Sequence, residues 1–198
     1  MSIPKKPVAL LIAATVALLA GPALAAGPSF DCGKAAAGSM EEGICRDPAL
    51  SALDARLSRV YRAATAKATN ERPPMLKAEQ RGWIKGRDDC WKSDDRRACL
   101  ETEYRRRIAE LQARYRLVPS RGPVTYACEN GAANEVIVTF FETDPPTLVA
   151  ERGDGTSLLF RGPGGVYQGR NESFREEQGK ARITWGSDAK EMSCAARP

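Results

Sequence analysis

The spacing of apolar residues changes near residue 120, and this change divides the chain into two folding units. Before Leu117 the apolar side chains recur every three or four positions, which is typical of amphipathic α-helices. After Pro123 they alternate in short runs separated by Gly, Pro, Asn or Asp, which is typical of β-strands. We therefore predict an α+β protein, with a helical domain at 27–117, a linker at 118–123 and a β domain at 124–198.

The first 26 residues have the composition of an export signal. Lys5 and Lys6 form a positive start, Val8–Leu19 is an apolar run, and Ala23–Ala25 is a small-residue cleavage site. The run is too short to span a membrane comfortably. A lipid anchor would need a cysteine at the cleavage site, whereas the first cysteine is Cys32. We expect residues 1–26 to be removed and the mature protein to be periplasmic or secreted, without a membrane anchor.

Six cysteines form an even set, as expected for disulfide bonds in an oxidising compartment. If disulfides stay within domains, Cys128 must pair with Cys194 and join the first strand of the β domain to the last. The pairing of the four cysteines before the linker is left open: Cys32, Cys45, Cys90 and Cys99. A metal site is disfavoured because the chain has no Cys-x-x-Cys spacing and no histidine. We predict neither a metal nor another cofactor.

The absence of histidine also excludes most hydrolytic machinery. Ser-His-Asp and Cys-His nucleophiles, the His-Glu-x-x-His zinc helix and a histidine acid or base are all impossible. The carboxylate pairs Asp88-Asp89, Asp94-Asp95 and Glu176-Glu177 are adjacent residues whose side chains point apart, which indicates surface positions. We therefore predict a protein that is not an enzyme, with a cell-wall hydrolase as the weakest alternative.

Charge is divided unevenly between the two units. Residues 27–121 hold twenty Lys and Arg against fourteen Asp and Glu, whereas residues 122–198 hold eight against eleven. The basic residues alternate with acidic ones, as on a solvated helix face, and an exported protein rarely meets nucleic acid. We expect no nucleic-acid binding, and we expect the acidic second half to face a cationic protein partner.

Helix signals in the first unit are strong. Ser39 and Glu42 have capping-box spacing, and Asp47-Pro48 begins a second helix. Its apolar stripe comprises Leu50, Leu53, Leu57, Val60, Tyr61 and Ala64. Another helix follows Pro73-Pro74, with an expected buried side of Leu76, Trp83 and Ile84. The last follows Asp94-Asp95, with a stripe of Leu100, Tyr104, Ile108, Leu111 and Tyr115. On it, Arg105–Arg107 are expected to form a solvated face paired with Glu101, Glu103 and Glu110.

Seven or eight short strands are expected in the second unit. So many strands in so few residues favour closure into a small antiparallel barrel, which removes exposed sheet edges. The candidates are Tyr126–Cys128, Glu135–Phe141, Thr147–Ala150, Ser157–Phe160, Val166–Tyr167, Ser173–Phe174, Lys180–Trp185 and Glu191–Cys194.

Both units resemble known families of exported bacterial proteins. Residues 30–115 resemble the LprI-type N-terminal domain, a cysteine-containing helical module named after a lysozyme-inhibiting lipoprotein. The residues that carry this resemblance occur in order: Cys32, Cys45, Asp47-Pro48, Trp83, Arg87, Cys90 and Cys99. Residues 124–195 resemble the MliC-type domain, a small β-barrel inhibitor of c-type lysozyme. There the matching segments are "YAC", "GGVY", "FREEQGKARI" and the terminal Cys194.

The second resemblance implies a binding mode in which two barrel loops enter the lysozyme cleft. In that family a serine in Ser-Gly-x-x-Tyr and a lysine in Lys-Gly-x-x-Ala contact the catalytic carboxylates. In this chain Pro163 replaces the serine and Gln178 replaces the lysine, and Lys180 is the nearest ammonium. The expected partner-binding residues are Pro163, Gly164, Tyr167, Gln178, Gly179 and Lys180.

The function expected from this resemblance is inhibition of a lysozyme, most simply a c-type enzyme, by blocking its active-site cleft. The alternative is a non-inhibitory envelope adaptor that uses the helical domain to bind another protein. Turns rich in glycine and a polar hairpin also occur in barrels with no binding role. The role of the helical domain, the orientation of the two domains and the oligomeric state are left open.

Overall fold

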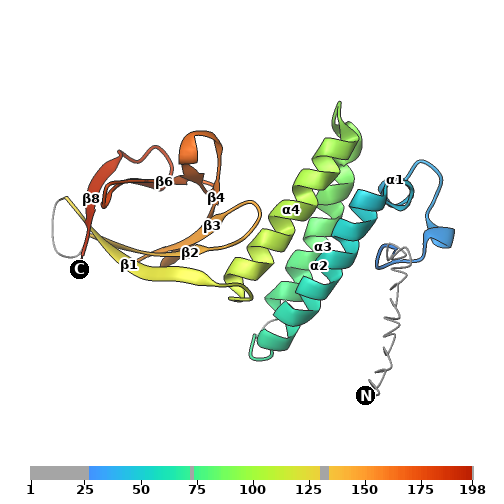
Figure 1. The fold of residues 1–198 in the computed structure, drawn as a ribbon, viewed down its shortest axis with the longest axis horizontal. Helices are drawn as coiled ribbons and strands as arrows, with labels where there is room; N and C mark the ends of the chain where they lie inside the picture. Colours follow the sequence, from blue (N-terminus) through green and yellow to red (C-terminus); the bar gives the residue numbers. More distant parts are fainter. Residues whose placement is uncertain (1–26, 72–73, 130–133, 198) are drawn as a thin grey trace, which may run out of the picture.

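The computed structural model describes residues 27–71, 74–129 and 134–197, in which a helical unit lies beside a closed β-barrel (Figure 1). The predicted export signal at 1–26 and Pro73 lie outside the described residues. The helical unit contains η1 (Cys32–Lys34), α1 (Met40–Arg46), α2 (Pro48–Lys67), α3 (Met75–Asp88), η2 (Asp89–Lys92) and α4 (Arg96–Arg114). No helix in the described part of the chain is long and apolar enough to cross a membrane.

Side-chain caps begin the helices where the sequence predicts. The Ser39 hydroxyl accepts a hydrogen bond from the Glu42 backbone N–H at 3.2 Å. Asp47 Oδ1 accepts from the Ala49 and Leu50 backbone N–H groups at 2.8 and 3.2 Å, and Asp95 Oδ1 accepts from that of Ala98 at 2.9 Å. Each cap satisfies N–H groups that have no partner within the helix.

The helical core forms where the apolar stripes of α2 and α4 meet. The stripes predicted for these helices are buried or partly buried. The prediction is wrong for Ile84 of α3, which is 39% exposed. Arg87, with a side chain only 4% exposed, takes the buried position one turn later, because Glu41, Asp88 and Tyr104 bind its guanidinium.

The predicted solvated face of α4 is only partly correct. Arg105 pairs with Glu101 and Arg107 with Glu110, as expected. Arg107 is nevertheless buried, with 3% of its side chain exposed, and its Nε donates to Gln80 Oε1 of α3 at 3.0 Å. It is buried because α4 lies between α3 and the barrel rather than at the outer surface.

The β unit is a closed barrel in which each strand pairs with the next and β8 pairs with β1. All pairs are antiparallel, so the predicted barrel is confirmed. Its strands are β1 (Ser120–Cys128), β2 (Glu135–Phe141), β3 (Thr147–Arg152), β4 (Gly155–Arg161), β5 (Tyr167–Gln168), β6 (Glu172–Glu177), β7 (Lys180–Trp185) and β8 (Met192–Ala196).

Three disulfides stabilise the fold, two within the helical unit and one within the barrel. Cys128 pairs with Cys194, which confirms the expected link between the first and last strands, and the two residues face each other in the β1–β8 register. The four remaining cysteines pair as Cys32–Cys45 and Cys90–Cys99. Both pairs are local, so each one tightens a turn of the helical unit.

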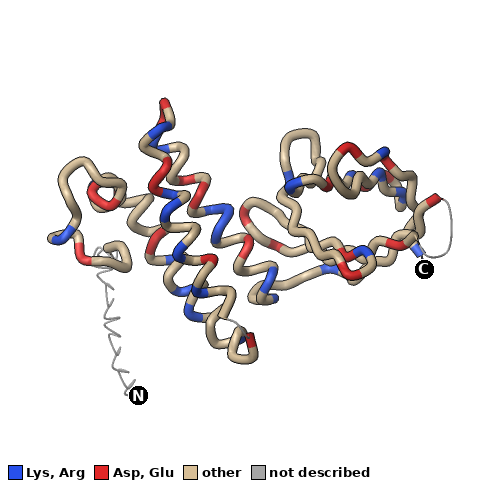
Figure 2. The backbone as a smooth tube through the Cα atoms, turned by 180° about the vertical axis from the view of Figure 1, so that it is seen from behind, with Lys and Arg blue, Asp and Glu red and all other residues tan. Residues whose placement is uncertain are grey.

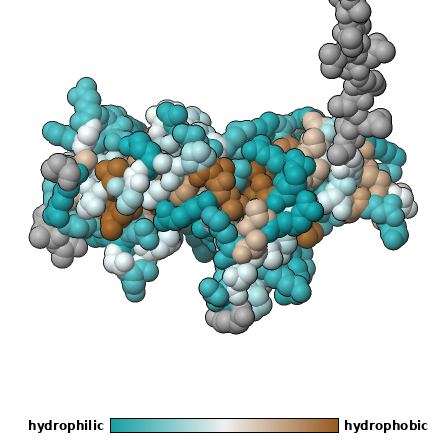
Figure 3. All heavy atoms as spheres, turned by 60° about the horizontal axis from the view of Figure 1, so that its bottom comes forward, coloured by the Kyte–Doolittle hydropathy of each residue, from teal (hydrophilic) through white to brown (hydrophobic). Residues whose placement is uncertain are grey.

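The two units meet along α4, which packs against β3 and β4. Arg105 forms an ion pair with Asp144 in the β2–β3 turn, and the Arg106 guanidinium lies 4.5 Å from the centre of the Phe160 ring. Acidic and basic residues alternate along the helices (Figure 2). On the face drawn in Figure 3, hydrophobic side chains form separate patches, one over the barrel and others where the two units meet.

Candidate partner-binding site

The β4–β5 turn and the β6–β7 turn lie at the same end of the barrel. Because β5 is antiparallel to both β4 and β6, these two strands run in the same direction and end on the same side. The turns that follow them are Pro163–Gly165 and Gln178–Gly179. We call this the η3 end of the barrel. The β2–β3 turn and the first residues of β1 also lie there, because the strand directions alternate around the ring.

The β4–β5 turn is a short 3-10 helix, η3, at Pro163–Gly165. Gly164 and Gly165 have φ values of +68° and +76°, which L-residues with side chains rarely adopt. The Gly162 backbone N–H donates to the Val166 carbonyl at 2.7 Å and closes the turn. Pro163 and Gly164 are exposed at its tip. Pro163 has neither a side-chain donor nor a backbone N–H, so it cannot replace the hydroxyl of a serine.

The β6–β7 turn is a two-residue hairpin loop. Gln178 and Gly179 have φ values of +52° and +76°, the combination found in type I′ turns. The Gly179 carbonyl accepts a hydrogen bond from the Ala196 backbone N–H at 3.1 Å, which ties the hairpin to β8. Gln178, Gly179 and Lys180 are all exposed. The turn therefore presents an amide and an ammonium to solvent from a firmly held backbone.

Tyr167 has a different environment from the other predicted site residues. It is half-buried and packs edge-on against Phe140 and Phe174, with ring centroids 5.9 and 6.3 Å apart. Tyr126 joins the same cluster through Phe174 at 5.3 Å. The ring of Tyr167 thus belongs to the barrel core, directly below the η3 turn.

Two further charged residues at the η3 end, Arg161 and Arg121, were not predicted as site residues. Arg161 faces Tyr167 across the β4–β5 pair and lies under the turn, because a Cβ added to Gly165 would lie 3.5 Å from Arg161 Nη2. Arg121 lies over the Phe140 ring, 4.0 Å from its centre, and pairs with Glu176. Period-2 alternation in β4 places Arg161 on the same face as the core residue Leu159. It does not predict the place of Arg121, because the pairing of β1 with β2 shifts register between Arg121 and Val124. Both arginines are exposed.

A buried tyrosine links this charged cluster to the barrel core. The Tyr126 hydroxyl donates to Glu176 Oε1 at 2.8 Å. Burial raises the pKa of Tyr126, and its hydrogen bond to the Glu176 carboxylate raises the pKa further. The tyrosine therefore stays protonated and keeps the carboxylate in place. Among the described residues, no three His, Cys, Asp or Glu side chains are grouped closely enough to hold a metal ion.

Comparison with known proteins agrees with both resemblances. The family profile described as "Lysozyme inhibitor LprI" matches residues 32–111. The profile described as "Membrane-bound lysozyme-inhibitor of c-type lysozyme" (MliC) matches residues 126–192. Proteins named Lipoprotein LprI from Mycobacterium bovis and Mycobacterium tuberculosis are 30% identical over 161 residues, which cover 80% of this chain and 80% of each relative. No solved structure gives a significant match. The chain therefore belongs to the LprI family of lysozyme inhibitors, with an MliC-type barrel after the LprI-type helical domain.

Proposed function

We propose that this protein is a periplasmic or secreted inhibitor that binds a lysozyme, with a c-type enzyme as the first candidate. The η3 end of the barrel enters the active-site cleft and excludes the substrate. The observation that carries the proposal is the presence of the η3 turn and the Gln178–Gly179 hairpin at one barrel end, where a single cleft can receive both. The inhibitor needs no chemistry of its own.

The chemistry of the target explains which side chains matter. A retaining glycosidase holds two carboxyl groups about 5–5.5 Å apart, one of them ionised during catalysis. A cation placed between them forms charge-assisted hydrogen bonds and occupies the position of the sugar. Since Gln178 has no charge and Pro163 has no donor, we assign the cationic contact to Lys180, with Arg161 below the η3 turn as the second cation.

Lysis of a cell-wall suspension tests this proposal. Lysozyme clears the suspension, and the purified protein in excess is expected to slow the loss of turbidity. Lys180→Ala is expected to weaken inhibition by about tenfold, the effect of one lost hydrogen bond to a charged group. Lys190→Ala is the matched control, because Lys190 is exposed in the β7–β8 loop at the opposite end of the barrel.

Three outcomes would count against the proposal. Unchanged lysis at excess protein excludes c-type enzymes, and the assay is then repeated with goose-type and invertebrate-type lysozymes. Equal loss of inhibition in Lys180→Ala and Lys190→Ala would mean that the η3 end is not the contact surface. Clearing of the suspension by the protein alone would identify a hydrolase rather than an inhibitor.

A non-inhibitory envelope adaptor is the second candidate. The observation in its favour is the replacement of both family contacts, by Pro163 and Gln178. On this alternative the barrel is a structural unit and the helical domain binds another exported protein. Failure of all three lysozyme classes to bind the purified protein in calorimetric titrations would favour the adaptor over the inhibitor.

A further inference from the structure

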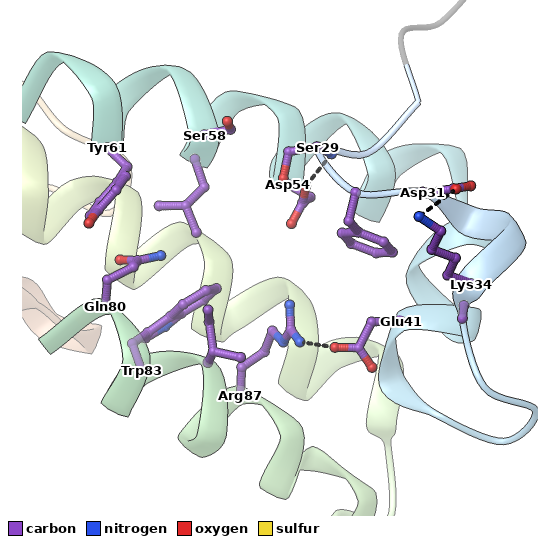
Figure 4. A pocket seen from close by; sticks show the side chains of 14 residues that line it. Ser29, Asp31, Lys34, Glu41, Asp54, Ser58, Tyr61, Gln80, Trp83 and Arg87 are labelled. Atoms are coloured by element: carbon purple, nitrogen blue, oxygen red, sulfur yellow. Dashed lines mark hydrogen bonds and ion pairs between the residues drawn. The ribbon is translucent and has the colours of Figure 1, made fainter. Parts of the chain in front are cut away.

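A pocket of about 490 Å³ opens between α2, α3 and the segment before α1 (Figure 4). Its walls are largely apolar. Three aromatic side chains line it, Phe30, Tyr61 and Trp83, together with the aliphatic Leu57 and Ile84. Trp83 and Arg87, which carry the resemblance to the LprI family, both line this pocket. A cavity of this size at the meeting of three segments is large enough for an extended side chain or a small ligand.

Five charged residues line the pocket: the acids Asp31, Glu41 and Asp54, and the bases Lys34 and Arg87. Lys34 pairs with Asp31 at 3.8 Å and Arg87 with Glu41 at 2.6 Å, which leaves Asp54 as the one lining acid without a cation within 4.0 Å among the described residues. Asp54 of α2 is only 6% exposed. Its Oδ1 accepts from the Ser29 backbone N–H at 2.6 Å and its Oδ2 from the Tyr104 hydroxyl at 2.9 Å. In the part of the chain that the structure describes, no Lys or Arg nitrogen lies within 4.0 Å of Asp54. A buried carboxylate is usually paired with a cation, and this one is bound only by neutral donors.

The one buried cation in this pocket, Arg87, is already matched by acids. Its Nη2 lies 2.6 Å from Glu41 Oε1 and 2.6 Å from Asp88 Oδ1, and its Nη1 donates to the Tyr104 hydroxyl at 3.0 Å. The connected network therefore contains one positive charge and three negative charges, counting Asp54. Figure 4 shows Asp54 and Arg87 coming from different helices, with the Arg87 guanidinium directed at Glu41. The Tyr104 hydroxyl lies between the two residues, 3.0 Å from Arg87 Nη1 and 2.9 Å from Asp54 Oδ2.

The acidic and aromatic walls are held in place before any ligand arrives. The Cys32–Cys45 disulfide joins the segment that carries Phe30 to α1. The hydrogen bond from Ser29 to Asp54 ties the same segment to α2. Because the walls are already ordered, binding a ligand costs less conformational entropy.

We propose that this pocket binds a basic side chain, a lysine or an arginine, of a protein partner. The ammonium or guanidinium group pairs with Asp54 and the free oxygen of Glu41. The aliphatic stem lies along Leu57 and Ile84, and the aromatic faces stabilise the cation. An anion would meet the carboxylates of Asp54 and Glu41, and a neutral aliphatic chain would leave Asp54 without a cationic partner. Binding of a basic side chain by this pocket does not depend on the proposed function. Only the identity of the partner, a cationic lysozyme, rests on that function.

Nuclear magnetic resonance tests this proposal without any lysozyme, so its failure is distinct from failure of the proposed function. The purified protein labelled with ¹⁵N is titrated with blocked lysine (Nα-acetyl-lysine methylamide) and with the blocked arginine analogue. The readout is the indole N–H signal of Trp83, assigned with a Trp83→Phe variant. The signals of Trp91 and Trp185 are internal references, because neither residue lines the pocket. Saturable shifts confined to Trp83 are expected with both basic probes.

Matched probes and variants separate a charge effect from simple filling of the pocket. Blocked norleucine has a stem of similar length without the charge and is expected to cause no saturable shift. Asp54→Asn is expected to weaken lysine binding by about 10- to 100-fold, the effect of one lost charge-assisted hydrogen bond. Asp94→Asn removes an exposed acid outside the pocket and is expected to leave binding unchanged.

A second variant is needed because Asp54→Asn also disturbs buried hydrogen bonds. Ile84→Trp places a larger side chain at a 39% exposed position on the pocket wall and leaves the Asp54 network untouched. It is expected to abolish the lysine-induced shift while circular dichroism and the melting temperature stay as in the parent protein. Retained binding in Ile84→Trp, or equal binding of lysine and norleucine, would overturn the proposal. Shifts produced by chitotriose and not by lysine would overturn it in favour of a saccharide pocket.

Discussion

Two side chains at the η3 end differ from the residues that the resemblance to the MliC family implies, and each difference removes a specific group from the proposed contact surface. Pro163 lacks the serine hydroxyl and Gln178 lacks the lysine ammonium. The backbone of both turns is nevertheless closed by hydrogen bonds and by glycines with positive φ. The loss is therefore one of side-chain chemistry rather than of turn geometry, and single substitutions can restore it.

Restoring the lysine is expected to strengthen inhibition. Gln178 already has a long side chain at a backbone φ of +52°, so replacing it with lysine adds no new backbone strain. One added charge-assisted contact is expected to lower the protein concentration for half-inhibition of c-type lysozyme by about tenfold. The matched control is Asn171→Lys, the same change of charge in an exposed loop at the opposite barrel end. Equal gains in both variants would indicate general attraction instead of a specific contact.

Among the helices, α2 depends on its N-cap. The Asp47 carboxylate binds two backbone N–H groups at the start of the helix and also the Arg97 guanidinium of α4 at 2.9 Å. Asp47→Ala is expected to lower the free energy of unfolding by about 1–2 kcal/mol, measured by urea denaturation. Asp47→Asn retains an oxygen acceptor and should lose less. Equal destabilisation by alanine and asparagine would show that the charge matters more than the cap.

The Asp47 cap is expected to stabilise the protein less in acid. The backbone N–H of Leu50, then that of Ala49 and the Arg97 guanidinium, hold the pKa of Asp47 below its usual value. A carboxyl group whose pKa is lower in the folded state stabilises the protein above the unfolded pKa of about 3.9 and loses this effect as the pH falls through the folded pKa. The stability difference between the parent and Asp47→Asn should therefore shrink below about pH 4. A difference that grows there would contradict this assignment.

For the molecule as a whole, the disulfide that closes the barrel is expected to contribute most among the three. Cys128–Cys194 spans 66 residues and Cys90–Cys99 spans 9. In the chain-entropy model, closing these loops stabilises the fold by about 4 and about 2.5 kcal/mol respectively. The double variants Cys128→Ser/Cys194→Ser and Cys90→Ser/Cys99→Ser, compared by urea denaturation, test this order. A larger loss from the shorter loop would mean that local strain or packing outweighs chain entropy.

Alkaline pH is expected to destabilise both units. Burial raises the pKa of Tyr104, Tyr115 and Tyr126, and each hydroxyl also donates to a carboxylate, of Asp54, Glu71 and Glu176 respectively. In the unfolded chain these tyrosines ionise near pH 10. Above that pH the unfolded state has lost protons that the folded state retains, so the free energy of unfolding falls as the pH rises.

Tyrosinate absorption and circular dichroism, followed together, check this expectation. Ionisation of these three tyrosines should accompany loss of the circular dichroism signal. Tyr126→Phe should reduce the decline in stability between pH 9 and 11, because one of the three groups no longer titrates. Ionisation of all three near pH 10 with an unchanged circular dichroism spectrum would exclude the buried hydrogen bonds.

Local signals in the sequence predicted the four α-helices and the strands, but not the three 3-10 helices. The predicted linker at 118–123 is partly wrong, because β1 begins at Ser120. Caps at Ser39, Asp47 and Asp95 start helices because the donors that they satisfy lie within the next three residues. Alternation after residue 123 predicted the strands because every second side chain must enter a barrel. The Cys128–Cys194 pair was predicted on the condition that disulfides stay within domains, because only these two cysteines follow the linker. The helix caps and the alternation depend on neighbours in the chain, so the sequence alone determined them.

Only the tertiary structure decided the features that involve residues far apart. Arg87 is buried and Ile84 exposed because carboxylates from α1 and α3 and a tyrosine from α4 converge on the guanidinium. Arg161 lies close to Gly165 of the η3 turn because the pairing of β4 with β5 sets it opposite Tyr167. The acidic pocket forms because the segment before α1 folds back on α2. Each depends on the packing of separate elements, which hydrophobic periodicity does not encode.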